Sequence, residues 1–306
     1  MLRRVLLSAS RNKWIEEFTR TSSLSRPVVR RFVAGETVDD VVRTTRALVA
    51  SGLTVSLDRL GEDTEDVGQA KAVTSAYLTV LRRLADEGLT GGAEASVKLS
   101  AVGQALDERL CVDNALQIVQ AADAAGTAVT FDMEDHTTTD STLAILAEVR
   151  ADYPSTGAVI QAYLHRSAAD VEDLIAAKAR VRLCKGAYKE PESVAWQDKS
   201  DVDRSYVRLL TRLMEAGHYP MVATHDPRLV SIAGELARRF GRARGSYEYQ
   251  MLYGIRPEEQ KRLAGEGNQV RVYVPYGDEW YGYLMRRLAE RPANLAFFLR
   301  ALASRS

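Results

Sequence analysis

The feature that most constrains the fold is an alternation of short apolar segments and amphipathic segments, which starts after Gly52 and repeats eight times. Such an alternation is typical of βα units that build a parallel sheet. The predicted strands cover residues 53–58, 94–100, 128–133, 158–164, 181–186, 221–225, 246–252 and 269–275. The helices predicted to follow them cover residues 65–87, 113–125, 141–150, 168–178, 203–216, 227–240, 257–263 and 279–302.

Eight βα units in about 250 residues have the size of a (βα)8 TIM-type barrel. A doubly wound sheet is the alternative, but it usually has about five or six parallel strands. We therefore expect an α/β chain with a single barrel domain over residues 1–306, made of an N-terminal helical segment (1–50) and eight βα units (51–306). Two or three extra N-terminal helices are expected to cover one end of the core, around Trp14, Ile15 and Phe18, around Val28, Val29, Phe32 and Val33, and over 39–49.

The composition excludes several classes of protein. The 41 Lys and Arg residues balance the 41 Asp and Glu residues and are interspersed with them, which argues against a nucleic-acid-binding surface. No apolar stretch approaches the ~18 residues of a membrane-spanning helix, so any membrane contact is expected to be peripheral. The apolar run near the start is too short for a signal peptide. Two cysteines, Cys111 and Cys184, cannot form a disulfide framework or a metal cluster, and they favour a cytoplasmic location.

Polar residues recur at or near the C-terminal end of the predicted strands, where barrel enzymes place their active sites. This pattern predicts an enzyme or a tight small-molecule binder. The residues are Asp58, Lys98, Ser100, Asp132, Glu134, Gln161, Arg182, Lys185, Thr224, His225, Glu248, Gln250, Arg271 and Tyr273.

The segment VRLCKGAY, residues 181–188, is the central candidate. Period-2 alternation sends its two aliphatic side chains to one face and Arg182 to the other. Lys185 and Gly186 follow at the strand end, and a cation beside a glycine suits an anionic or electron-accepting ligand. A surface strand end with solvated Arg and Lys is the alternative.

Lys98 lies between Val97 and Leu99, which are expected to face the helices, so its ammonium is expected to face the barrel interior. A buried ammonium needs a partner, and Asp132 is the expected one. The pair is either catalytic or purely structural. Metal chemistry is weakly supported, because the four histidines lack ligand spacing. No GxGxxG motif follows a strand, which argues against a separate Rossmann domain.

The last predicted helix contains a cluster for binding an anion. Tyr283 lies three and four residues before Arg286 and Arg287, so the phenol lies beside both guanidiniums. Arginine binds carboxylates with a planar fork of donors. The alternative is a solvated helix face, because Glu290 and Arg291 follow within a turn.

Seven of these motifs together resemble the proline dehydrogenase family, including the proline-oxidising domain of the bifunctional proline utilisation flavoproteins. They occur in the order that the family has, from about Lys98 to Asn294: SVKLSA, FDMED, VIQAYLHRS, VRLCKGAYKE, VATHD, YEYQMLYG and YGYLMRRLAERPAN. The resemblance implies a distorted (βα)8 barrel that binds FAD. It further implies oxidation of L-proline to Δ1-pyrroline-5-carboxylate by hydride transfer to flavin N5, the first step of proline catabolism to glutamate. Electrons would pass to a membrane quinone through a peripheral contact.

The resemblance also implies roles for individual residues. Asp132 and Arg182 would lie at the reaction centre. The substrate would be bound by Lys98, Leu252, Tyr273, Tyr283, Arg286 and Arg287. FAD would be bound by Met133, Gln161, Arg182, Lys185, Gly186, Ala187, Tyr188, Thr224 and His225. Two positions depart from the family: Lys189 stands where the bifunctional enzymes have an aromatic residue, and Cys184 where a small aliphatic is usual.

The oxidation needs a neutral substrate amine, and cations around it would lower its pKa. We expect Lys98, Arg182, Arg286 and Arg287 to supply that charge, opposed mainly by Asp132 and Glu248. Three other functions stay open. They are a Schiff-base aldolase that uses Lys98 or Lys185, a folate-reducing flavin barrel, and a barrel without catalytic activity.

Overall fold

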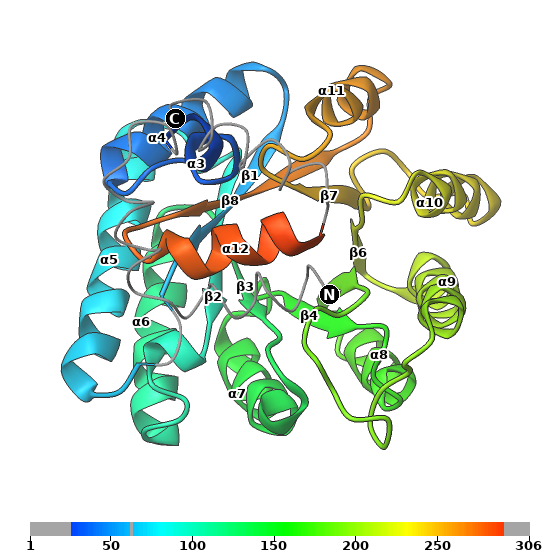
Figure 1. The fold of residues 1–306 in the computed structure, drawn as a ribbon, viewed down its shortest axis with the longest axis horizontal. Coiled ribbons are helices and arrows are strands. Elements are labelled where there is room, and N and C mark those ends of the chain that lie inside the picture. The colour runs from blue at the N-terminus through cyan, green and yellow to red at the C-terminus, as the bar shows by residue number, and fades with distance from the viewer. Residues whose placement is uncertain (1–25, 62–63, 291–306) are drawn as a thin grey trace, which may run out of the picture.

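The computed structural model describes residues 26–61 and 64–290. Eight parallel strands form its centre: β1 (Thr54–Arg59), β2 (Ala93–Lys98), β3 (Val129–Asp132), β4 (Ala158–Gln161), β5 (Arg180–Cys184), β6 (Tyr219–Ala223), β7 (Glu248–Leu252) and β8 (Val270–Tyr276). They are hydrogen-bonded in the order β3-β2-β1-β8-β7-β6-β5-β4. The edges β3 and β4 meet through Gly157, whose backbone bonds to Val129 and Phe131 at 2.8 and 3.0 Å. The sheet is therefore a nearly closed barrel (Figure 1).

Helices surround the strands on the outside of the barrel (Figure 1). They are α4 (Val38–Ala50), α5 (Val67–Asp86), α6 (Glu108–Ala124), α7 (Thr139–Asp152), α8 (Ser167–Ala176), α9 (Lys199–Ala216), α10 (Pro227–Arg239) and α11 (Pro257–Gly265), with short 3-10 turns η1 (Ser100–Val102) and η2 (His136–Thr138). The predicted (βα)8 barrel is confirmed, because each of the eight predicted strands is present and a helix follows each of them.

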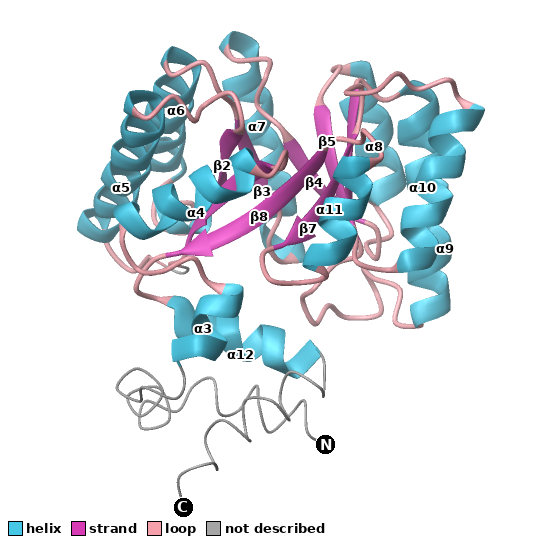
Figure 2. Ribbon diagram, turned by 90° about the horizontal axis from the view of Figure 1, so that it is seen from above, coloured by secondary structure: helices cyan, strands magenta, loops and turns pink. Residues whose placement is uncertain are grey.

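Two further helices lie at one end of the barrel. They are α3 (Arg26–Phe32) and α12 (Trp280–Glu290), and Figure 2 shows them together at the end toward which β8 points. Phe32 of α3 packs in one apolar cluster with Trp280 and Leu284 of α12. The prediction that N-terminal helices cover one end therefore holds for α3. It is wrong for α4, which packs Val41 and Val42 into the core beside the strands.

Helix boundaries differ from the prediction where capping residues were overlooked. Helix α6 begins at Glu108 and not near Asp113, because the Asp107 side chain accepts a 2.7 Å bond from the amide of Leu110 and caps the helix. The helix predicted around Trp14 and the predicted continuation of α12 beyond Glu290 lie outside the described residues.

The outer and inner faces of the barrel strands carry different kinds of side chain. Aliphatic side chains on the outer face of the strands, such as Val97, Leu183 and Val272, form the core against the helices. Inside the barrel, buried polar and charged side chains replace the usual branched aliphatics.

No helix in the described ranges is long and apolar enough to span a membrane. Among residues 26–61 and 64–290, no group of His, Cys, Asp or Glu side chains is arranged to hold a metal.

Candidate active site

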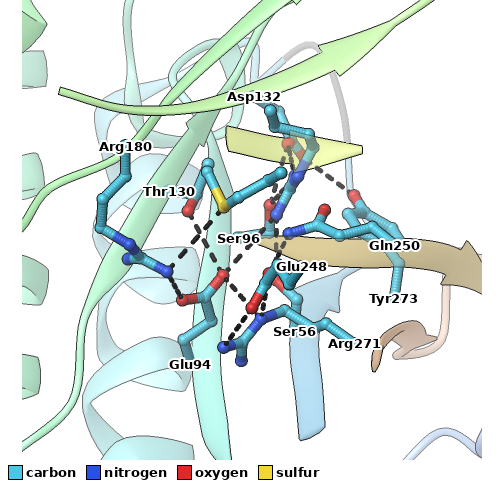
Figure 3. Close-up of polar contacts among 12 residues, drawn as sticks. Ser56, Glu94, Ser96, Thr130, Asp132, Arg180, Glu248, Gln250, Arg271 and Tyr273 are labelled. Carbon is cyan, nitrogen blue, oxygen red and sulfur yellow. Dashed lines mark hydrogen bonds and ion pairs between the residues drawn. The ribbon is translucent and has the colours of Figure 1, made fainter. Parts of the chain in front are cut away.

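Arg182 of β5 lies at the centre of a polar cluster inside the barrel. Its Nη1 donates to Asp132 Oδ1 at 2.6 Å and to Ser96 Oγ at 2.8 Å, and its Nη2 donates to Ser56 Oγ at 3.2 Å. The hydroxyl of Tyr273 donates to Asp132 Oδ2 at 2.7 Å, and the Tyr273 ring centroid lies 5.4 Å from the Arg182 guanidinium carbon. Figure 3 shows Asp132, Ser96 and Tyr273 converging on this region from three strands. The two predicted catalytic residues therefore form one ion pair.

Lys98 does not pair with Asp132, so that prediction is wrong. Its Nζ lies 2.9 Å from both carboxylate oxygens of Asp58 at the end of β1. Lys98 and Asp132 are neighbours in the β2–β3 ladder, but Arg182 and Tyr273 already hold both oxygens of Asp132. Alternation along a strand identifies the inward face correctly, but it does not say which of two nearby acids an inward lysine will contact.

A second layer of charges lies closer to the N-terminal ends of the strands. Glu94 accepts a 2.7 Å bond from Arg180, and its Oε1 lies 3.5 Å from Arg271 Nε. Arg271 donates to both carboxylate oxygens of Glu248 at 2.7 and 3.1 Å. Glu248 therefore opposes Arg271 in this lower layer and not the cations of the predicted site, which corrects the expectation. Arg182 Nη2 lies 3.8 Å from Glu94 and connects the two layers.

The pKa values of two buried acids, Glu94 in the lower layer and Asp58 beside Lys98, are moved in opposite directions. Burial alone would raise the pKa of Glu94, but the guanidiniums of Arg271, Arg180 and Arg182 outweigh it and lower the pKa to about 2. Burial is also the largest influence on Asp58 and raises its pKa, against the opposing effect of the Lys98 ammonium. Burial and the Asp132 carboxylate raise the pKa of Tyr273 well above its usual range, so the phenol keeps the proton that it donates.

Residues at the ends of β3 and β4 are held by the connection that follows β3. The Gln161 amide donates to the Glu134 carbonyl at 2.7 Å. The Glu134 carboxylate in turn accepts bonds from the hydroxyl and the amide of Ser100 at 2.8 and 3.2 Å. Met133 directly precedes Glu134 in the sequence, and its side chain is buried. The predicted cofactor residues Met133 and Gln161 therefore lie at the C-terminal end of the barrel.

Thr224 and His225 follow β6 and contact neighbouring backbone. The Thr224 hydroxyl accepts a 3.1 Å bond from the amide of Asp226. His225 Nε2 accepts a 2.9 Å bond from the amide of Leu252, so in the neutral ring the proton is on Nδ1. Leu252 is also the ladder neighbour of Tyr273. This places the predicted substrate residue Leu252 between the His225 imidazole and the polar cluster.

Lys185 and Gly186 begin the long connection from β5 to α9. The Lys185 ammonium contacts Asp203 at 2.5 Å and Asp226 at 3.4 Å, so it belongs to a charge network at the starts of α9 and α10. Gly186 has a φ of +109°, and an added Cβ would lie 2.2 Å from the ring of Tyr163. A side chain at this position is therefore excluded both by backbone conformation and by space.

The three residues that follow Gly186 lie at the surface. Ala187, Tyr188 and Lys189 are exposed. Cys184 donates a weak bond from its thiol to the Ile160 carbonyl at 3.5 Å, and burial raises its pKa to about 11. The thiol is therefore protonated at neutral pH, and neither departure from the family pattern alters the polar cluster.

Helix α12 packs one face against α3. Tyr283 is buried, and the Arg287 guanidinium carbon lies 5.2 Å from the centroid of its ring. Arg287 is partly buried, which disfavours a fully solvated helix face at that residue. The side chain of Arg286 lies outside the described part of the chain, so the predicted arginine clamp stays a prediction.

Sequence reasoning missed several residues that complete the two layers. No role was assigned to Asp58, and Ser56, Glu94, Ser96 and Arg180 were not named. Arg271 was expected near the C-terminal end of its strand, which is wrong, because it is the second residue of β8. A usable signal was present, because alternation puts Ser56 and Asp58 on one face of β1 and puts Glu94, Ser96 and Lys98 on one face of β2. Buried polar residues at successive inward positions indicate a polar barrel interior.

Comparison with known proteins identifies relatives over nearly the whole chain. Residues 41–300 match the proline dehydrogenase family. The chain is 40% identical to proline dehydrogenase 1 of Bacillus subtilis (strain 168), over 99% of both proteins. It is 37% identical to the proline dehydrogenase of Deinococcus radiodurans, over 99% of this chain and 98% of that protein.

Solved structures of longer proteins share the fold. The chain superposes on proline utilization A (PutA) from Bdellovibrio bacteriovorus with a TM-score of 0.81 at 23% identity, covering 92% of this chain and 34% of that one. It superposes on PutA from Bradyrhizobium japonicum with a TM-score of 0.73 at 25% identity, covering 90% of this chain and 32% of that one. The chain thus spans about a third of these longer proteins. The family match and the full-length relatives together show that this chain belongs to the proline dehydrogenase family.

Proposed function

We propose that this chain oxidises L-proline to Δ1-pyrroline-5-carboxylate with FAD as its cofactor. The observation that carries the proposal is the cluster of hydrogen-bonded polar side chains at the C-terminal end of the barrel, formed by Arg182, Asp132 and Tyr273 in a chain of the proline dehydrogenase family. This is the end of a barrel at which enzymes of this architecture place their active sites.

Two features of the chain are compatible with a bound flavin. The buried Nε of Arg182 has no hydrogen-bond partner among the described residues, so a donor remains available to a group inside the barrel. Gly186 follows the same strand in a conformation that only glycine adopts readily, and it lets the backbone approach its surroundings closely. We propose that Met133, Gln161, Arg182, Lys185, Gly186, Ala187, Tyr188, Thr224 and His225 hold the FAD.

FAD would accept a hydride, which carries both electrons, from the carbon next to the substrate nitrogen, and the proton on that nitrogen would be released to solvent. The role of the protein is to orient the reactants and supply fixed charge. Asp132, Ser96 and Ser56 hold both terminal nitrogens of Arg182, so its guanidinium is a rigid cation. A rigid cation stabilises negative charge that develops nearby without having to reorient during the reaction.

The substrate residues are proposed from the family resemblance together with their places in the fold. Lys98, Arg286 and Arg287 would bind the carboxylate, and Leu252, Tyr273 and Tyr283 would enclose the ring. Among the described residues, Asp58 balances Lys98, and Asp132 balances Arg182. The charge that lowers the substrate amine's pKa is therefore smaller than four unopposed cations would give.

The electrons leave the enzyme by a second reaction. We propose a quinone as acceptor and a cytoplasmic protein that contacts the inner face of the membrane peripherally. A coupled assay tests this: purified enzyme with L-proline should reduce a soluble quinone analogue, and the rate should increase with vesicles that contain a long-chain quinone. Reduction of the analogue that does not depend on L-proline would contradict the proposed substrate.

The competing functions have separate tests. A Schiff-base aldolase would be labelled at Lys98 or Lys185 by borohydride in the presence of its substrate, and the proposed enzyme should not be labelled with L-proline. A folate-reducing flavin barrel would be reduced rapidly by a nicotinamide cofactor, and the proposed enzyme should be reduced by L-proline instead.

A further inference from the structure

We propose that Asp58 is a positioning residue that holds the Lys98 ammonium at the substrate end of the barrel. The inference deepens the proposed function and rests on it. The sequence pattern does not assign this role, because it predicted Asp132 of β3 as the partner of Lys98, whereas the actual partner, Asp58, lies on β1. The assignment comes from the contact between the ends of β1 and β2.

The contact is close and buried. Lys98 Nζ lies 2.9 Å from both carboxylate oxygens of Asp58, whose residue is 1% exposed, while Lys98 is 9% exposed. In the β1–β2 ladder Asp58 stands opposite Ser96, so Lys98 extends beyond it toward the strand ends. Asp58 therefore holds the ammonium at the C-terminal ends of β1 and β2.

Other titratable groups approach Asp58 from three elements, and Tyr273 lies close enough to lower the pKa of Asp58. Tyr77 of α5 donates its hydroxyl proton to the Ser96 carbonyl at 2.7 Å. Tyr273 of β8 donates its proton to Asp132 of β3 at 2.7 Å. Burial and, to a lesser extent, the Asp58 charge raise the pKa of Tyr276, also of β8, and the Asp132 charge raises the pKa of Asp58. Lys98 is consequently the cation that compensates Asp58 within the described ranges.

This arrangement predicts what loss of the carboxylate does. Neutralising Asp58 removes the charge that attracts the Lys98 ammonium, so this contact no longer fixes the Lys98 side chain in its position. A negative charge would also vanish from the site, and a protonated substrate amine would be less well tolerated there. Catalysis should therefore become slower, and its dependence on pH should shift.

The test is a double-mutant cycle on the FAD-loaded enzyme with L-proline as substrate. Asp58→Asn should lower kcat/KM at least ~10-fold, and Lys98→Met should lower it at least as much. The double variant should equal Lys98→Met within about a factor of two, because Asp58 acts through Lys98. Additive losses in the double variant would overturn the proposal.

The pH profile gives a readout that a merely structural ion pair would not move. The acidic limb of kcat reports groups in the enzyme–substrate complex, and in Asp58→Asn it should move to lower pH by at least ~0.5 unit. Glu248→Gln is the matched control: it neutralises a buried carboxylate of the lower layer, paired with Arg271, and should leave the limb in place. An unmoved limb in Asp58→Asn would also contradict the proposal.

Failure of this inference and failure of the proposed function are distinguishable. A wild-type enzyme that FAD and L-proline do not activate would refute the function, whatever the variants do. If Asp58→Asn does not fold, Asp58→Glu replaces it in the cycle, because it keeps the charge and displaces the carboxylate by one methylene. Its loss of kcat/KM should likewise disappear in the Lys98→Met background, and a loss that persists there would reject the positioning role.

Discussion

At the residue scale, the site depends on pairing charges that the barrel buries. Arg182 is held by one carboxylate and two hydroxyls, and Asp132 is held by Arg182, Ser96 and Tyr273. Buried ionised groups are tolerated only when their hydrogen-bonding atoms have partners. Each member of the cluster therefore fixes the orientation of the next one.

Tyr273→Phe tests this interdependence. The change removes the 2.7 Å bond to Asp132 and keeps the aromatic ring beside Arg182. A hydrogen bond to a charged group contributes about 1.5–3 kcal/mol, so kcat/KM for L-proline should fall by about tenfold or more. Steady-state kinetics measures the loss.

Tyr219→Phe provides the comparison, because it removes a similar 3.0 Å bond to Glu248 in the lower layer. This variant should lose stability and keep its kcat/KM. If Tyr273→Phe were as active as wild type, the hydroxyl would have no part in fixing the Asp132 carboxylate for catalysis.

The sequence predicts the identity of most polar residues at the site but not their pairing. Alternation correctly places Lys98, Asp132 and Arg182 inside the barrel, because side chains on a strand point to opposite faces in turn. The pairing of Lys98 with Asp58 depends on the stagger between neighbouring strands and on the reach of Arg182 across the barrel. Neither quantity is encoded in a single strand's pattern.

At the scale of elements, the connection from β5 to α9 is fixed from two sides. Gly186 packs against the Tyr163 ring, and the buried Glu190 carboxylate accepts a 3.0 Å bond from the amide of His136 and contacts the His136 imidazole. Tyr163 also donates to Glu190 at 3.3 Å. The connection therefore joins the ends of β3, β4 and β5, where the proposed cofactor residues lie.

Gly186→Ala should weaken flavin binding by at least about tenfold. Alanine at φ +109° is strained, and its Cβ would overlap the Tyr163 ring, so the chain around Lys185 must move. Titration of the apoprotein with FAD, followed by flavin fluorescence, measures the dissociation constant.

Gly126→Ala is the matched control for this change. Gly126 also has a positive φ, of +72°, but nothing lies within 4 Å of its added Cβ. The control should cost about 1 kcal/mol of stability and leave FAD affinity unchanged. Equal affinities in the two variants would mean that the contact between Gly186 and Tyr163 does not shape the cofactor site.

Glu190→Gln should loosen the same connection. The change keeps an acceptor for the His136 amide but removes the charge that the imidazole contacts. Amide hydrogen exchange over residues 187–198 should accelerate, with little change in the core strands. Glu192→Gln, at an exposed position two residues later, should exchange like wild type. Unchanged exchange in Glu190→Gln would show that the ion pair does not hold the connection.

At the scale of the whole molecule, the barrel encloses a charged interior instead of an aliphatic one. The (βα)8 architecture could be predicted because eight apolar runs and eight helical patterns alternate along the chain. The position of α12 over one end could not, because a helix with one apolar face is compatible with packing either in the outer layer or across the mouth. Its contact partner α3 is remote in sequence, and no local pattern connects them.

The charged interior predicts a specific response to acid. The pKa of Glu94 falls from an ordinary 4.5 to about 2 on folding, so its ionised form stabilises the fold above about pH 4.5. That stabilisation, on the order of 3 kcal/mol, is lost as pH falls from about 4.5 to 2. Glu94→Gln should therefore unfold more easily at neutral pH. The difference from wild type in unfolding free energy should shrink across that pH window. A constant difference between pH 7 and pH 2 would contradict the assigned ionisation.

The central claim is that the cluster around Arg182 serves flavin-dependent oxidation of L-proline, and one spectrum tests it most directly. Purified protein, incubated with FAD and freed of excess cofactor, is recorded between about 300 and 600 nm without oxygen, before and after L-proline is added. We expect a protein-bound flavin whose visible absorbance bleaches with L-proline and stays unchanged with D-proline or glycine. A bound flavin that remains oxidised in L-proline, or a protein that binds no flavin, would contradict the account.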